Sequence, residues 1–243
     1  MKRSISIFLV ILLIALTAVL LAACGGGMTS EDLTNAYEAY KTADAITLKI
    51  EDNDRHTNNI ANGFRLLTTA EIAFDAEKGM VFVSMEYTRR NLIEGEIGKG
   101  AYELFYSLDG TKVNCYKRNP RDYTPQWQLI KTEEFATQTE AMAYLRNQYL
   151  SAQTVDEVLF PTFTKLTFDE TYSKSFFANK YTWKPTDNRF KYTYELSFKD
   201  GKVTEFTYQH KSAKTGNVDD SRKFSLTIEY SADINVPTDL PTA

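Results

Sequence analysis

Residues 190–208 read FKYTYELSFKDGKVTEFTY, and this stretch decides the fold class. Apolar and polar residues alternate on both sides of Asp200-Gly201. Alternation with a period of two is typical of a half-buried strand, and Asp-Gly between two such runs favours a tight hairpin. The stretch therefore predicts two antiparallel strands, each with one apolar face.

The same alternation recurs along most of the chain, which predicts an α+β protein with an antiparallel sheet. Helical spacing of apolar residues predicts helices over 31–43, 133–150 and 154–160, and Thr137 and Glu140 form a capping box in the second. Long strands with one apolar face need a cover, which the N-terminal helix and this central helical insertion can supply. Further strands are expected over 45–51, 64–76, 80–89, 101–108, 111–117, 202–211 and 222–231.

Polar and glycine-rich segments separate these elements. The polar stretch 52–62 is predicted to be a loop, and the three glycines of 94–100 predict a flexible hairpin loop, because their spacing fits no phosphate-binding pattern. No linker or repeat interrupts the chain, so residues 31–237 are expected to form a single domain, followed by a C-terminal tail over 238–243.

The first 23 residues differ from the rest of the chain. Met1-Lys2-Arg3 is basic, and Ile5 to Ala23 is almost continuously apolar and ends in small residues. This order is typical of a secretory signal peptide over residues 1–23. Because about 20 apolar residues also suffice to cross a bilayer, an uncleaved transmembrane anchor is the alternative.

The end of this segment, Leu21-Ala22-Ala23-Cys24, resembles the bacterial lipobox. The resemblance implies that signal peptidase recognises Leu21, Ala22 and Ala23, and that Cys24 carries a covalent diacylglycerol, with a third acyl chain on its amino group in many bacteria. Two or three acyl chains anchor a protein stably, whereas one chain does so only marginally. Residues 24–30 would then form the lipidated cysteine and a short, flexible Gly-rich tether. We expect a lipid-anchored protein on the extracytoplasmic face of the bacterial cell membrane, or on the outer membrane of a Gram-negative cell.

Charge and cysteine content narrow the class of protein further. The formal net charge of −4 excludes a strongly basic nucleic-acid binder, and loss of Lys2 and Arg3 with the signal peptide would make the chain more acidic. Lipidation of Cys24 would leave Cys115 alone, so no intramolecular disulfide is expected. Cys115 lies in step with Val113 on a predicted strand, which favours a buried small residue over a reactive thiol.

The layout of the mature chain resembles the LolA/LppX-like lipoprotein carriers. The resemblance rests on the lipobox, a helix that runs directly into a strand, long antiparallel strands and a helical insertion. The endings Ile228-Glu229-Tyr230 and Ile234-Asn235-Val236-Pro237 also resemble that group. It implies a curved, half-barrel-like sheet that encloses, with its helices, an apolar cavity for acyl chains.

The aromatic strand faces allow two interpretations. They could form the wall of a cavity for an apolar ligand, or plain core, because aromatic residues favour half-buried sheet surfaces. The candidate ligand wall consists of Phe190, Tyr192, Tyr194, Leu196, Phe198, Phe206 and Tyr208.

Three functions follow from these observations. The first is a non-enzymatic lipoprotein that binds or carries an apolar, lipid-like ligand. The alternative is an envelope protein-interaction or scaffold module with a filled core, docking through its sheet or through the basic, aromatic loop 117–123. An enzyme is disfavoured, because the chain has no G-x-S-x-G, S-x-x-K or H-E-x-x-H motif, and because His56, in a polar stretch, and His210, near a strand end, favour surface or turn positions over ligand roles. No metal and no cofactor other than the covalent lipid is expected.

Overall fold

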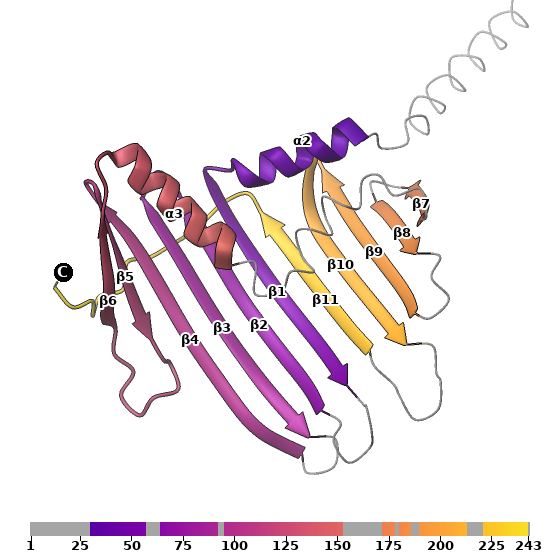
Figure 1. The fold of residues 1–243 in the computed structure, drawn as a ribbon, viewed down its shortest axis with the longest axis horizontal. Helices are drawn as coiled ribbons and strands as arrows, with labels where there is room; N and C mark the ends of the chain where they lie inside the picture. The colour runs from indigo at the N-terminus through magenta and orange to yellow at the C-terminus, as the bar shows by residue number, and fades with distance from the viewer. Residues whose placement is uncertain are drawn as a thin grey trace, which may run out of the picture.

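The computed structural model describes residues 30–56, 64–91, 95–152, 172–177, 180–185, 190–212 and 221–242. Within these ranges the chain forms an antiparallel sheet of 11 strands and two helices (Figure 1), which confirms the predicted α+β class. The helices are α2 (Ser30–Lys41) and α3 (Gln138–Ala152). The strands are β1 (Ala45–His56), β2 (Phe64–Asp75), β3 (Met80–Asn91), β4 (Gly95–Asp109), β5 (Lys112–Arg118), β6 (Gln128–Glu134), β7 (Tyr172–Phe177), β8 (Lys180–Pro185), β9 (Phe190–Lys199), β10 (Lys202–Ser212) and β11 (Ser221–Glu229).

The first and last strands meet inside the sheet. The strand order is β6-β5-β4-β3-β2-β1-β11-β10-β9-β8-β7, so β1 pairs with β2 on one side and with β11 on the other. Each half of the sheet is a series of antiparallel neighbours, consecutive in sequence. The predicted hairpin is confirmed at β9 and β10, where Asp200 and Gly201 have φ angles of 53° and 72°. Positive φ at both central residues is what the tightest hairpin turns require.

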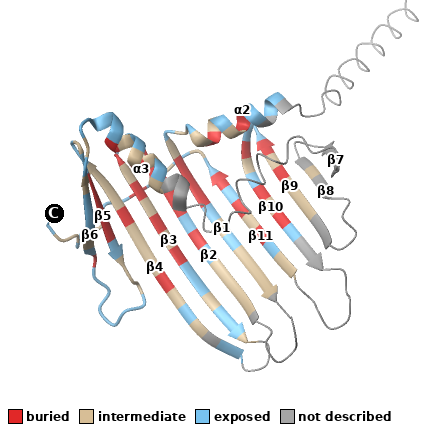
Figure 2. Ribbon diagram, viewed as in Figure 1, coloured by how far each residue is buried: buried red, intermediate tan, exposed pale blue. Residues whose placement is uncertain are grey.

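The main core lies between the sheet and the two helices. Alternate residues of β1 and β2 bury their side chains on this face, and Ile46, Leu48 and Ile72 are fully buried. Ala36 and Tyr40 of α2, and Ala141 and Leu145 of α3, pack into the same cluster. Figure 2 shows the buried positions concentrated where the helices lie on the strands. We call this surface of the sheet the helix-side face.

A second, smaller core covers part of the opposite face, which we call the outer face. Phe105 and Trp127 are buried there together with Ile234 of the C-terminal segment. Hydrogen bonds hold this segment: Thr47 Oγ1 donates to the Ser231 carbonyl at 2.8 Å, and Lys78 Nζ donates to the Ile234 carbonyl at 3.2 Å. The C-terminal segment therefore packs across the outer face.

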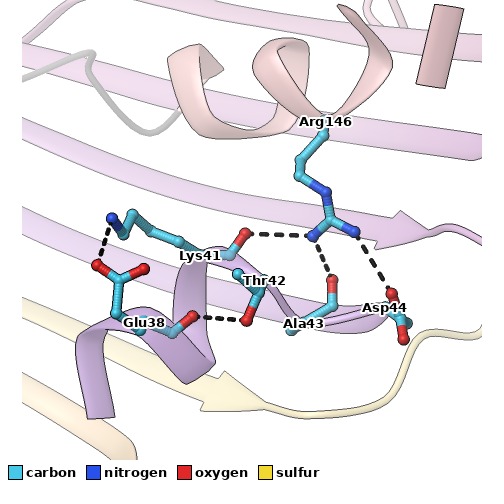
Figure 3. A network of polar contacts seen from close by, with 6 residues as sticks. All are labelled: Glu38, Lys41, Thr42, Ala43, Asp44 and Arg146. Atoms are coloured by element: carbon cyan, nitrogen blue, oxygen red, sulfur yellow. Dashed lines mark hydrogen bonds and ion pairs between the residues drawn. The ribbon is translucent and has the colours of Figure 1, made fainter. Parts of the chain in front are cut away.

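Arg146 of α3 ties the two helices to the start of β1. Its guanidinium donates to the carbonyls of Ala43 at 2.7 Å and Lys41 at 3.2 Å, and reaches Asp44 Oδ1 at 3.4 Å (Figure 3). It also lies 4.7 Å from the centre of the Phe74 ring. These carbonyls follow the last turn of α2, where backbone acceptors have no partner within the helix. Arg146 therefore satisfies the end of one helix from the other.

Two predicted loops are wrong where the structure describes them, because residues 52–56 and 95–100 are strand; residues 57–62 and 94 lie outside the described residues. Strand β1 continues through Asp52 to His56, because its polar side chains find partners on neighbouring strands, such as Arg222 for Asp52. The glycine segment forms the start of β4, and Gly100 lies opposite Tyr87 of β3. A Cβ at Gly100 would collide with the Tyr87 ring, so the glycine gives room to the aromatic side chain.

The central helix begins later than predicted. Glu140 N–H donates to Thr137 Oγ1 at 3.2 Å, which confirms the Thr137 cap, but residues 133 and 134 belong to β6. Strand β6 has mostly exposed side chains on both sides, since it is an edge strand, and it therefore carries no alternating pattern. The helix predicted over 154–160 lies outside the described residues.

We predict that Arg146→Leu lowers the free energy of unfolding by about 2 kcal/mol, because two carbonyls lose a charged donor at a partly buried site. Urea denaturation of both proteins measures the difference. Arg121→Leu is the matched control: its guanidinium makes an ion pair of 3.2 Å with exposed Glu86, which contributes under about 1 kcal/mol. Equal losses in the two variants would contradict the role of Arg146.

Candidate functional site

An aromatic cluster spans three strands of the helix-side face. The ring centroids of Tyr194 and Tyr208 are 4.9 Å apart, those of Tyr194 and Phe206 6.4 Å, and those of Phe206 and Phe224 6.1 Å. Cross-strand pairing produces this arrangement, because β10 places Tyr208 opposite both Tyr194 of β9 and Phe224 of β11. Strand pairing thus joins aromatic residues from distant parts of the sequence into one surface.

The structure brings five members of the candidate ligand wall into this surface. Leu196, Phe198, Phe206 and Tyr208 are buried in the main core, and Tyr194 is half-buried against it. Helix α2 lies over this part of the sheet and contacts β10. The remaining two wall residues belong to β9, where Tyr192 pairs with His210 and Phe190 with Ser212; their side chains lie outside what the structure describes.

A second half-buried group on the same face comes from β4, and it is absent from the predicted wall. Tyr102, Leu104 and Tyr106 alternate along the strand and pack against the main core without being fully buried. Their period of two is visible in the sequence, but only the register with β3 shows that they share a face with β9 and β10. Helix α3 covers this side of the sheet and contacts β2, β3, β4 and β5.

Cys115 of β5 is buried on this face, as predicted, opposite Tyr106 of β4. Burial raises the pKa of the Cys115 thiol, and the hydrogen bond with Tyr106 offsets only part of that increase. Burial likewise raises the pKa of Tyr106 far above its ordinary value, with a further contribution from Cys115. Both groups are therefore neutral at physiological pH, which suits an apolar surface.

The apolar surface ends at an ion pair towards the far end of the strands. Arg222 of β11 donates through Nε to Asp52 Oδ1 at 3.0 Å and through Nη2 to Asp52 Oδ2 at 2.6 Å. The two side chains are only 11% and 16% exposed. Asp52 follows Ile50 on the helix-side face of β1, so the polar pair directly adjoins apolar residues.

The structure does not describe the predicted lipidation site. Cys24 and the residues before it, Leu21 to Ala23, lie outside the described residues, so lipidation stays a prediction. Among the residues described, no helix is long and apolar enough to span a bilayer, and no three metal-ligating side chains come together. In the loop after β5, Tyr123 is fully exposed and Arg118 stacks on Trp127 at 4.7 Å.

We predict that Cys115 reacts with a thiol reagent at least about tenfold more slowly in the folded protein than in urea at pH 8, because its raised pKa leaves less thiolate and burial blocks access. The folded protein binds this proton more tightly than the unfolded chain. The corresponding stabilisation is present below the ordinary thiol pKa and is lost as pH rises through the folded value. Labelling by mass spectrometry measures the rates, on protein whose Cys24 is absent or lipidated. Equal rates in both states would contradict the burial.

Comparison with known proteins gives limited further information. No family model and no curated protein matches the chain. An S-type phycobiliprotein lyase from Guillardia theta aligns at 9% identity over 85% of this chain and 100% of its own, with a TM-score of 0.22. A LolA superfamily protein from Nitrosomonas europaea aligns at 8% identity over 86% and 96%, also at 0.22. A porin-like protein from Bacteroides uniformis aligns at 11% over 78% and 97%, at 0.19. The LolA superfamily is thus among the similar structures, but TM-scores this low do not establish a shared fold.

Proposed function

We propose that the chain is a non-enzymatic, extracytoplasmic bacterial lipoprotein that binds an apolar, lipid-like ligand on the helix-side face of its sheet. The observation that carries the proposal is a band of apolar and aromatic side chains on this face, from β4 to β9, part of which is only half-buried. Tyr102, Leu104 and Tyr194 belong to this half-buried part. Apolar surface of this kind binds hydrocarbon chains by removing it from water.

The half-buried part of β1, beyond the fully buried Ile46 and Leu48, supports a binding region beside the covered centre of the face. Helix α2 contacts β10, and α3 contacts β2 to β5, so β1 and β11 lie between the strands on which the two helices chiefly pack. Ile50 of β1 is one of the half-buried residues there. Arg146 joins α3 to the end of α2 and fixes the helices relative to β1.

The ion pair at the edge of the surface suits the polar end of a lipid. An acyl chain lying along Ile50 and the aromatic cluster would place its polar group near Arg222 and Asp52. The pair presents a cationic donor and an anionic acceptor at the end of the apolar surface. In this proposal the ligand therefore has one apolar and one polar end.

Uptake of a fluorescent fatty acid by the mature chain, purified without its lipid, tests the binding. We predict saturable uptake, and about tenfold weaker uptake by Tyr194→Ser, because the variant removes apolar area from the half-buried surface. Tyr123→Ser is the matched control, since Tyr123 is fully exposed in a loop away from this face, and its uptake should equal that of the wild type. No co-purified lipid in mass spectra together with no uptake would contradict the proposal and favour the scaffold alternative.

Substitution of Cys24 tests the anchor separately. We predict that Cys24→Ala in the producing bacterium gives a longer, unlipidated precursor, because the lipid acceptor and the cleavage site are lost together. Metabolic labelling with palmitate and gel mobility measure the two effects, and Cys115→Ala should be processed like the wild type. If Cys24→Ala were still acylated and cleaved after residue 23, the lipoprotein proposal would be wrong.

A further inference from the structure

Arginine side chains from three neighbouring strands lie in one row on the outer face. Arg55 near the end of β1 pairs with Arg65 of β2, which pairs with Arg90 of β3. Strand alternation places all three on the face away from the helices, because Leu48, Ile72 and Val83 of the same strands face the helices.

A groove of about 370 Å³ lies on this part of the sheet. Arg65 Nε donates to Asn53 Oδ1 at 2.8 Å, which fixes the guanidinium beside the groove. Lys223 of β11 lies opposite Asn53 and adds another cation. The groove is lined by Asn53, Arg55, Arg65, Gln209, Ser221, Arg222 and Lys223.

No carboxylate is among the residues that line the groove. Among the residues that the structure describes, no carboxylate forms an ion pair with Arg65, Arg90 or Lys223. The acids of the outer face gather closer to the helices instead, around a second groove lined by Glu51, Glu71 and Glu86. The groove thus gathers four cationic side chains in a chain whose net charge is −4.

Strand register also places like charges side by side. Arg65 lies directly opposite Arg90 of β3, and like charges in this position repel each other. An anion in the groove would remove the repulsion and accept hydrogen bonds from the guanidinium groups. Arginine recognises phosphate and related oxyanions with two parallel hydrogen bonds, which are among the stronger ones in proteins.

We propose that the groove lined by Arg55, Arg65 and Lys223 binds a phosphate-class oxyanion, with Ser221 and Gln209 as neutral hydrogen-bonding groups. The site lies on the outer face, at the end of β1 opposite to the α2 junction (Figure 1), and Arg222, which lines the groove, also pairs with Asp52 on the helix-side face. The anion is either a free phosphate group or the headgroup of a phospholipid.

Titration with inorganic phosphate at constant ionic strength tests the site. We predict saturable binding by calorimetry to the mature chain without its lipid, and about tenfold weaker binding to the double variant Arg65→Gln/Lys223→Gln. In phosphate-free buffer the double variant should unfold at the same temperature as the wild type or higher, because like charges are removed. If Arg65 and Lys223 served only to stabilise the fold, the double variant would instead unfold at a lower temperature than the wild type.

Two further measurements separate the sources of the anion. Co-sedimentation with phosphatidylglycerol–phosphatidylcholine vesicles, but not with phosphatidylcholine alone, would identify a lipid headgroup, whereas binding of phosphate without vesicle binding would identify a free ligand. Lys49→Gln is the control variant, because Lys49 lies on the same face but pairs with Glu229 at 2.6 Å outside the groove. The proposal fails if wild type binds neither probe, or if Lys49→Gln and the double variant lose binding equally.

Discussion

Burial of one face of a long antiparallel sheet is the constraint on which the rest of the structure depends. The strands that meet at the centre, β1 and β11, carry Leu48 and Ile228 opposite each other, and both side chains are buried. Helices α2 and α3 pack over this face, and Arg146 joins them by donating to carbonyls at the end of α2. Removal of apolar area from water holds the layers together, and the polar contacts fix where the helices lie.

The two faces of the sheet are used differently. The helix-side face is apolar and ends at the Asp52–Arg222 pair, so its chemistry suits a molecule with a long apolar part. The outer face has a small core under the C-terminal segment, and beyond it the charges separate into an acidic and a basic region. One sheet therefore carries an apolar surface on one face and a cationic groove on the other, and Arg222 contributes to both regions.

Short-range patterns in the sequence predicted the strands, turns and caps that depend on residues close together in the chain. The alternation over 190–208, the turn at Asp200-Gly201 and the cap at Thr137 are confirmed, because each depends on residues close in sequence. The sequence does not predict strand β6, because an exposed edge strand has no alternating apolar face. The polar pattern predicts a loop at the end of β1, because the partner of Asp52 there, Arg222, lies 170 positions away in the sequence. The sequence alone also does not show on which face Tyr102 lies or that the arginines form a row, because both follow from strand register.

The pairing of β1 with β11 has a consequence for how the chain folds. The two halves of the sheet meet along this one seam, whose strands come from the beginning and the end of the domain. Contacts between such distant segments require closure of a very long loop, and proteins dominated by them fold slowly. The halves β2–β6 and β7–β10 consist of neighbouring hairpins and can form early. The pairing of β1 with β11 can form only after the last strand is available. Until then each half exposes an unpaired edge and an apolar face, so the incomplete chain is the state most exposed to aggregation.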